Sequence, residues 1–182
     1  MLQVTPATVA SWIDQGHLKG HKTPTGRRRV ASADLADFLH EHGMSVPAEL
    51  AGTRERPVVM VVEDDPSYLQ ALVRTLEREA PDVEVVTATT GVDGLLEIGR
   101  MGPDLVILDY QLPDLNAVQV VERLLDPSRR LTAEVMVVTG GMPMEAEAEL
   151  RRVGVRNIVN KADGMPAVLE GIRRALEERQ AA

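Results

Sequence analysis

The sequence predicts an α/β fold: a five-stranded, doubly wound parallel sheet that follows a small, mainly helical N-terminal module. Two observations support the sheet. Beyond residue 56, short β-branched runs alternate five times with segments whose apolar residues recur every three or four positions. The centres of these runs are hydrophobic, as in strands that helices cover on both faces. A third observation, two short helical patterns around a basic stretch, predicts the separate module.

The five runs are six or seven residues long, too short for buried helices, and are predicted to be strands. They occupy residues 57–62, 83–88, 104–110, 134–140 and 156–161. Segments with helical periodicity follow them at residues 66–79, 91–100, 116–125, 143–153 and 164–179. Asp65 and Pro66 give the first of these helices an N-cap and a proline at its first position.

The N-terminal residues predict a helix, a hairpin and a second helix. Thr5, followed by proline, caps a helix over residues 6–15, and Gly16 ends it. The segment at residues 20–30 has Pro, Thr and Gly at its centre, so we expect its flanks to pair as a hairpin. Ser32 is expected to cap the second helix. This order is the outline of a winged DNA-binding module.

We therefore divide the chain into a module at residues 1–41, a linker at residues 42–56 and a sheet domain at residues 57–182. The linker mixes Gly, Pro and charged residues without a sustained apolar period, and we expect one helical turn at residues 47–51.

Charge is distributed unevenly over a chain whose net charge is −8. Residues 1–56 carry a net charge of +1, and residues 57–182 carry −9. Residues 17–30 hold five Lys or Arg and two His without an acidic residue. This asymmetry predicts an anionic partner for the N-terminal part.

The composition excludes several classes of protein. The sequence contains no cysteine, which excludes disulfides, thiolate metal sites and cysteine nucleophiles. No uninterrupted apolar run approaches the roughly 18 residues of a membrane span. The first residues do not show the basic and then apolar pattern of a secretory signal. We expect a cytoplasmic protein without a membrane partner.

Polar side chains stand where four of the predicted strands end. Glu63 and Asp64 follow the first strand, Asp109 the third, Thr139 the fourth and Lys161 the fifth. Ligands of open parallel sheets bind at this edge. Clustered carboxylates repel one another unless a cation joins them, and hard oxygen ligands suit Mg²⁺. With a metal there, Asp109 could attack a phosphoryl group, and the hydroxyl and ammonium groups suit its oxygens.

The residues Glu63-Asp64, VILDYQLPD, VVTG and Lys161 resemble the conserved set of the response-regulator receiver family. The steps of 30 residues from Asp109 to Thr139 and of 22 from Thr139 to Lys161 are similar to that family's spacing. The resemblance covers residues 57–182 and implies a flavodoxin-like receiver.

The resemblance implies a role for each acidic residue. Asp109 would be the phosphoacceptor and a metal ligand. Asp64 would bind Mg²⁺ directly, Glu63 would bind it through water, and the backbone carbonyl of Gln111 would be the third protein ligand. Asp65 is instead assigned to the helix cap.

The resemblance also implies how the phosphoryl group is held and supplied. Thr139 would donate a hydrogen bond to it and draw its loop inward, and Lys161 would pair with its oxygens. The donor would be a phosphohistidine on a sensor histidine kinase or phosphotransfer protein. The domain would not be an enzyme beyond its own phosphorylation and autodephosphorylation.

Three residues depart from the family pattern. Ile158 stands where the family usually has a Tyr or Phe switch residue, so we expect signalling through the Thr139 loop and the helix at residues 143–153. Ala162 replaces the usual proline, and a cis peptide bond there is not expected because it costs about 3–4 kcal/mol without proline. Ala117 replaces a common glycine.

Residues 4–39, TVASW through the GRRR segment to DFL, resemble the MerR and excisionase-like winged helix-turn-helix family. The resemblance implies that residues 6–15 form the recognition helix and residues 20–30 the wing. Only Met1–Gln3 stand where the family has its first helix, which we expect to be missing. Either the true start lies upstream, or another surface completes this small core. The implied DNA contacts are Thr8, Ser11, Lys22, Arg27, Arg28 and Arg29.

Two functions remain open at this stage. The first is a transcription regulator whose module binds DNA under control of the phosphorylated receiver, as a homodimer formed through the surface at residues 143–179. The second is a signalling adaptor whose degenerate module binds proteins rather than DNA. Ala10 and Ser11, in places where the family often carries arginine, favour the adaptor. An independent hydrolase is disfavoured, because no insertion builds a substrate pocket.

Overall fold

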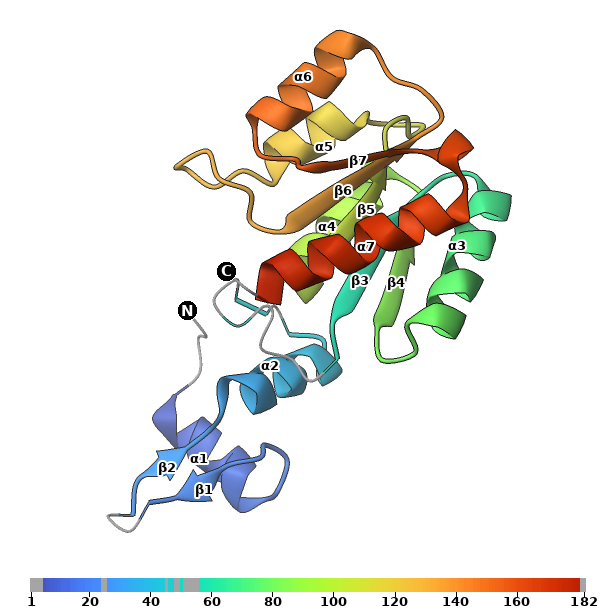
Figure 1. The fold of residues 1–182 in the computed structure, drawn as a ribbon. Coiled ribbons are helices and arrows are strands. Elements are labelled where there is room, and N and C mark those ends of the chain that lie inside the picture. Colours follow the sequence, from blue (N-terminus) through green and yellow to red (C-terminus); the bar gives the residue numbers. More distant parts are fainter. Residues whose placement is uncertain (1–4, 24–25, 45, 48–49, 51–55, 181–182) are drawn as a thin grey trace. The chain divides into compact units, whose positions relative to one another are not determined.

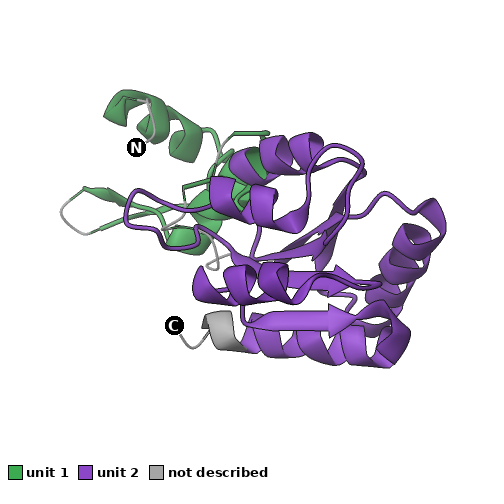
Figure 2. Ribbon diagram, turned by 90° about the horizontal axis from the view of Figure 1, so that it is seen from above, with its two compact units in different colours: residues 1–55, 100–102 green, residues 56–99, 103–182 purple. Residues whose placement is uncertain are grey.

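The computed structural model describes residues 5–23, 26–44, 46–47, 50 and 56–180. The chain forms two compact units, residues 1–55 with 100–102 and residues 56–99 with 103–182 (Figure 2). Each unit has its own hydrophobic core. The boundaries predicted from the sequence remain predictions.

The larger unit contains a five-stranded, wholly parallel sheet in the order β4-β3-β5-β6-β7 (Figure 1). Its strands are β3 (Val58–Val62), β4 (Glu84–Ala88), β5 (Leu105–Asp109), β6 (Glu134–Thr139) and β7 (Asn157–Asn160). All five residues of β3 and of β5 are buried. The sequence prediction of a doubly wound parallel sheet is confirmed.

Five helices cover the two faces of this sheet. They are α3 (Pro66–Glu79), α4 (Gly91–Met101), α5 (Ala117–Arg123), α6 (Met144–Arg152) and α7 (Met165–Gln180). Leu72 of α3 and Ile172 of α7 belong to one buried cluster, whereas Ile98 of α4, Val121 of α5 and Leu150 of α6 belong to another. The sheet therefore separates α3 and α7 from α4, α5 and α6, as Figure 1 shows.

The predicted helices and strands agree with the structure to within one or two residues at each end. One difference affects the site. The strand predicted at residues 156–161 ends at Asn160, and Lys161 begins a short 3-10 helix, Lys161–Asp163. The side chain of Asn160 accepts a hydrogen bond from the backbone N–H of Ala162 (2.9 Å), which starts this turn. A proline at position 162 could not donate that bond.

The N-terminal unit consists of α1 (Pro6–Asp14), a hairpin of β1 (His21–Lys22) and β2 (Arg28–Arg29), and α2 (Ser32–Glu41). The predicted helix–hairpin–helix order is confirmed. Thr5 accepts a hydrogen bond from the N–H of Thr8 (3.2 Å), as expected of a cap. The predicted cap at Ser32 is wrong, because α2 begins one residue earlier, with Ala31 at the N-cap. Residues Met1–Gln3, where the family's first helix is expected to be missing, lie outside the described residues.

A small cluster forms the core of this unit. The rings of Trp12 and Phe38 lie 4.9 Å apart, and Leu18 and Leu39 are buried beside them. Val46, inside the stretch interpreted as a linker, is also buried in this cluster. The helical turn expected at residues 47–51 lies largely outside the described residues.

None of the helices that the structure describes is long and apolar enough to span a lipid bilayer.

Replacement of a fully buried strand residue should destabilise the larger unit strongly. Leu108 of β5 is 0% exposed, so we expect Leu108→Ala to lower the free energy of unfolding by about 2–5 kcal/mol through lost burial and the resulting cavity. Leu96 of α4 is 67% exposed, and Leu96→Ala should change it by less than about 0.5 kcal/mol. Urea titration measures both, and equal losses would contradict the assigned packing.

Candidate functional site

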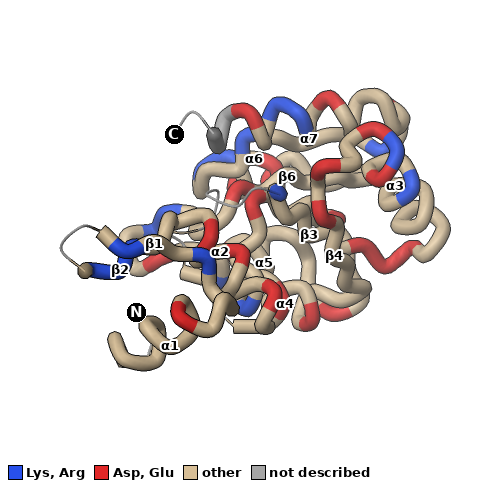
Figure 3. The backbone as a smooth tube through the Cα atoms, turned by 90° about the horizontal axis from the view of Figure 1, so that it is seen from below, with Lys and Arg blue, Asp and Glu red and all other residues tan. Residues whose placement is uncertain are grey.

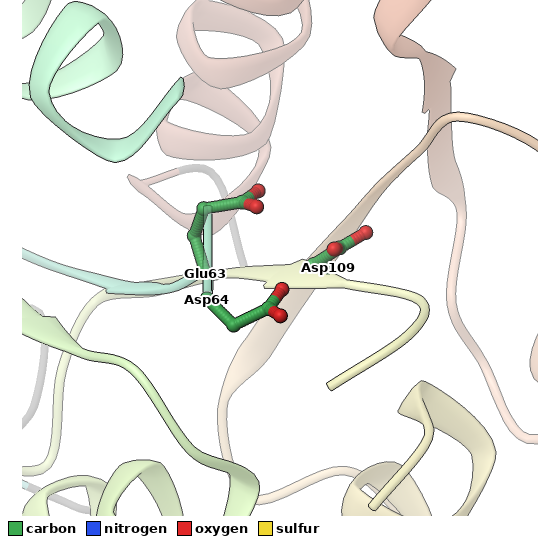
Figure 4. Close-up of side chains that lie close together, drawn as sticks. All are labelled: Glu63, Asp64 and Asp109. Atoms are coloured by element: carbon green, nitrogen blue, oxygen red, sulfur yellow. The ribbon is translucent and has the colours of Figure 1, made fainter. Parts of the chain in front are cut away.

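The polar residues predicted at the strand ends lie together at one edge of the sheet. Glu63 and Asp64 follow β3, and Asp109 is the last residue of β5 (Figure 4). One carboxylate oxygen from each of the three lies within 4.8 Å of the others. Glu63 and Asp109 are 2% and 8% exposed, whereas Asp64 is exposed to solvent. The site thus combines two buried acids with one accessible acid.

Lys161 joins the two buried acids. Its Nζ lies 2.7 Å from Glu63 Oε2, 3.0 Å from Glu63 Oε1 and 3.2 Å from Asp109 Oδ2. Its position at the start of the 3-10 helix directs it to this edge from the end of β7. The only lysine beyond residue 56 is therefore shared between the first and third strands of the chain's parallel sheet.

The buried charges alter one another's pKa values. Burial raises the pKa of Glu63 and of Asp109 above the usual carboxyl range, and the ammonium of Lys161 only partly opposes this. Burial by itself lowers the pKa of Lys161, but the hydrogen bond to Glu63 and the charge of Asp109 outweigh it and raise the pKa. The single ammonium of Lys161 balances only one of the two negative charges that the ionised carboxylates carry. The site can therefore accept further positive charge.

Tyr68, on the first turn of α3, contacts the same lysine. The Nζ of Lys161 lies 4.5 Å from the centroid of the Tyr68 ring. Burial raises the pKa of the phenol, so Tyr68 is neutral at physiological pH. Sequence reasoning missed this residue.

Thr139, the last residue of β6, is buried and bonded within its own loop. Its Oγ1 donates to the carbonyl of Gly141 (2.8 Å) and accepts from the N–H of Gly141 (2.9 Å). The hydroxyl is therefore engaged by the β6–α6 loop and makes no described hydrogen bond to Asp109.

An open pocket of about 510 Å³ covers these groups. Its walls include Asp64, Asp109, Gln111, Thr139 and Lys161. Glu63 does not line it, because this side chain lies behind Lys161 with both oxygens within 3.0 Å of the ammonium. The carboxylates of Asp64 and Asp109 belong to its lining, and carboxylate oxygens are ligands that Mg²⁺ prefers. The donor set therefore fits a divalent cation beside Asp109.

Asp114 organises the loop that carries Gln111. Its two carboxylate oxygens accept hydrogen bonds from the backbone N–H groups of Gly91 (2.8 Å) and Val92 (2.9 Å), at the start of α4. These bonds lower the pKa of Asp114. The interaction spans more than twenty residues of sequence, so no local pattern predicts it.

Ile158 of β7 is partly buried against the cluster that includes the residues of α5 and α6. It lies in the place expected of the family's switch residue, and its branched side chain offers no aromatic ring. Ile158 lies in β7, the strand that Lys161 directly follows.

The basic residues of the N-terminal unit gather on its hairpin (Figure 3). Asp14, at the end of α1, accepts from the Nε of Arg28 (3.2 Å) and lies 3.4 Å from the Nζ of Lys22. The hydrogen bond from Arg28 lowers the pKa of Asp14. The exposed side chains of Arg27 and Arg29 form no ion pair with any described residue. These two arginines therefore add positive charge to the hairpin that no described acidic residue pairs with.

Thr8 and Ser11, the two DNA contacts predicted on α1, have hydroxyl groups that interact with neighbouring side chains. Thr8 Oγ1 lies 2.9 Å from Thr5 Oγ1, and Ser11 Oγ accepts from the side chain of Gln15 (3.1 Å). No lysine or arginine lies on α1 itself. Its capacity to contact phosphates is therefore limited to such polar groups.

Two family models match the chain. The response regulator receiver domain matches residues 59–173, and a helix-turn-helix domain matches residues 1–43.

Curated proteins with similar sequences include regulators and an enzyme. The transcriptional regulatory protein KdpE of Mycobacterium tuberculosis is 31% identical over 125 residues, which are 69% of this chain and 53% of that protein. A protein-glutamate methylesterase/protein-glutamine glutaminase of Nitrobacter hamburgensis is 33% identical over 86 residues, 47% of this chain and 23% of that protein. The chain thus spans about half the length of these relatives or less.

Solved structures share the fold of the larger unit. A CheY-like response regulator receiver domain protein from Methanospirillum hungatei has a TM-score of 0.62 and 24% identity, over 69% of this chain and 98% of that chain. The signal receiver domain of a DNA binding response regulator protein (merR) from Colwellia psychrerythraea has a TM-score of 0.59 and 20% identity, over 66% and 98% of the two chains.

The hydrogen bonds of Asp114 predict a specific dependence of stability on pH. Because the folded pKa of Asp114 is lowered, its contribution is present above the usual carboxyl pKa and is lost as pH falls through the folded value. Asp114→Ala should therefore be less stable than wild type at pH 7, and the difference should close in acid. Thermal unfolding across pH measures this. The exposed Asp82→Ala is the control, and a difference that persisted in acid would contradict the account.

Proposed function

Because this chain belongs to the response regulator receiver family, we propose that it is a two-component response regulator that accepts a phosphoryl group on Asp109. The observation that carries the proposal is the contact of Lys161 with both Glu63 and Asp109 beneath an open pocket. The donor is a phosphohistidine on a sensor histidine kinase or phosphotransfer protein. Apart from its own phosphorylation and dephosphorylation, the chain is not an enzyme.

The transfer requires one bond to form and one to break. A carboxylate oxygen of Asp109 attacks phosphorus while the bond from phosphorus to the donor's histidine nitrogen breaks, and the imidazole leaves. Lys161, already 3.2 Å from Asp109, pairs with the phosphoryl oxygens in the same pocket. The acyl phosphate is later hydrolysed by water, which regenerates the carboxylate.

The residues present fit a magnesium site. Asp64, Asp109 and the backbone carbonyl of Gln111 would hold Mg²⁺, with Glu63 contributing through water. The bound ion supplies positive charge that neutralises the attacking carboxylate and the phosphoryl oxygens. Asp64 is the accessible member of the acidic group, which suits it to a direct ligand.

Thr139 connects phosphorylation to a change in the conformation of the β6–α6 loop. To donate to a phosphoryl oxygen, its hydroxyl must leave the carbonyl of Gly141. The loop that follows leads into α6, so its rearrangement alters the surface formed by residues 143–179. Homodimerisation through this surface then pairs two N-terminal modules.

The N-terminal unit is proposed to bind DNA. Its support is the helix-turn-helix match together with the basic hairpin, where Arg27 and Arg29 are free of ion pairs among the described residues. One small module neutralises few phosphates, so specific binding requires a dimer. Phosphorylation would thus control transcription by controlling dimer formation.

A second candidate is a receiver-type signalling adaptor whose N-terminal unit binds proteins. The specific observation in its favour is Asp14, which pairs with both Lys22 and Arg28 of the hairpin and offsets one of their two positive charges. The expected recognition helix, α1, contains no lysine or arginine, which supports the adaptor further.

Asp109→Ala should abolish Mg²⁺-dependent labelling by a small ³²P-labelled acyl-phosphate donor, because the attacking oxygen is lost. The wild-type label should be acid-stable and released by base, as expected of an acyl phosphate. Asp82→Ala, an exposed acid in the turn before β4, should label like wild type. Equal labelling of Asp109→Ala and wild type would exclude Asp109 as the acceptor.

Charge changes on the hairpin should distinguish the two candidates. With acyl-phosphate-treated protein and a mixed-sequence DNA duplex, Arg27→Ala with Arg29→Ala should reduce the slope of log affinity against log salt by up to about two. Asp14→Ala should increase affinity because it frees Lys22 and Arg28. Fluorescence anisotropy across salt concentrations measures both. Binding that none of these substitutions alters, or no binding by wild type, would favour the adaptor.

A further inference from the structure

Aromatic rings are scarce in this chain, and one of them contacts the lysine of the site. The sequence holds one Trp, one Phe and two Tyr, and of these only Tyr68 and Tyr110 lie beyond residue 56. The ring of Tyr68 lies 4.5 Å from Nζ of Lys161, within the range of a cation–π interaction. Lys161 belongs to the family motif described above, whereas Tyr68 does not.

The first turn of α3 fixes the place of this ring. Asp65 Oδ1 accepts hydrogen bonds from the N–H groups of Ser67 (2.8 Å) and Tyr68 (3.1 Å). The ring then packs against the buried cluster that includes Leu72 of the same helix. Asp65, the residue after Glu63 and Asp64, is thus the N-cap that fixes the position of Tyr68 beside Lys161.

The hydroxyl group does not explain the presence of a tyrosine. The phenol oxygen of Tyr68 is buried and has no hydrogen-bond partner among the described residues. An aliphatic side chain would fill the same space without burying an unsatisfied polar atom. What the tyrosine provides and leucine would not is the face of its ring beside an ammonium group.

The geometry points to Tyr68 as a positioning residue that holds the ammonium of Lys161 at the phosphorylation site through the face of its ring. This inference rests on the proposed phosphorylation of Asp109. A lysine ammonium has three N–H donors, and the carboxylates of Glu63 and Asp109 accept from it in the structure described. The ring attracts the cation without offering a lone pair, so the N–H groups stay available to carboxylate and phosphoryl oxygens.

The ring of Tyr68 and the side chain of Ile158 also lie on opposite faces of the sheet. Tyr68 packs on the cluster formed with α3 and α7, whereas Ile158 packs on the cluster formed with α4, α5 and α6. The aromatic contact with the lysine in this chain therefore comes from α3, independently of the position expected for a switch residue on β7.

Initial rates of labelling by the small acyl-phosphate donor at saturating Mg²⁺ test the inference. Tyr68→Leu should label about 3- to 30-fold more slowly than wild type, the range that a cation–π contact of ordinary strength corresponds to. Tyr68→Phe restores the ring and should return the rate to within about twofold of wild type. Leu69→Ala is the matched control, since Leu69 is adjacent in α3 and packs against the same cluster.

A second measurement reads the contact without phosphate or metal. The chain has three lysines, Lys19, Lys22 and Lys161, so selectively labelled lysine gives few NMR signals, and Lys161→Arg assigns the relevant one. The signal of the Lys161 side chain should show a ring-current shift that Tyr68→Leu removes and that Tyr68→Phe and Leu69→Ala retain. Thermal unfolding of each variant reports folding separately.

The outcomes separate this inference from the proposed function. A wild type that is not labelled overturns both. A wild type that is labelled, with Tyr68→Leu labelled at the same rate, overturns the role of Tyr68 and leaves the phosphoacceptor in place. A rate lost equally in Tyr68→Leu and Leu69→Ala also overturns it, because packing alone would then account for the effect.

Discussion

The shared ammonium of Lys161 is the interaction on which the site depends. Parallel strands all end at one edge of the sheet, so the residues that follow β3 and β5 are brought together whatever their separation in sequence. Two of the carboxylates there, Glu63 and Asp109, are buried, and neither is tolerated as an isolated charge. Lys161 makes their burial possible. With Asp64 included, three acids face one ammonium, an excess of negative charge that favours a divalent cation.

The side chains of this site occupy different positions around the ammonium and the pocket. Glu63 lies behind the ammonium and holds it, Asp64 is accessible from the pocket, and Asp109 borders both. Thr139 is held by hydrogen bonds within its own loop. A phosphoryl group on Asp109 would add charge at the point where Lys161 and Thr139 can both respond. Local electrostatics would thereby be converted into a change in the β6–α6 loop.

Much of this could be predicted from the sequence, because the predicted strands have hydrophobic centres and polar residues stand at the ends of four of them. Asp109, Thr139 and Lys161 were found by their places after such strands. The interactions of Asp114 and Tyr68 were not, because their partners lie on segments distant in the sequence. The cap of α2 was misplaced because Ser32 is a good cap by type. Its neighbour Ala31 has the extended backbone of an N-cap.

In the N-terminal unit, the sequence predicted the elements and left their charge balance undetermined. The hairpin could be expected from its turn residues, but the pairing of Asp14 with Lys22 and Arg28 depends on how α1 packs beside β1 and β2. A count of basic residues therefore overstates the charge available to an anionic partner. Arg27 and Arg29, which form no ion pair with any described residue, are the better measure.

The central claim, that the excess negative charge at the strand ends binds a divalent cation, is tested most directly by calorimetric titration of Mg²⁺. Wild type should bind one Mg²⁺ per chain, and Asp64→Asn should bind it much more weakly, because the accessible carboxylate is lost. The exposed Asp82→Asn, remote from the pocket lining, should bind like wild type. Equal Mg²⁺ affinity in wild type and Asp64→Asn, or no binding by wild type, would contradict the account.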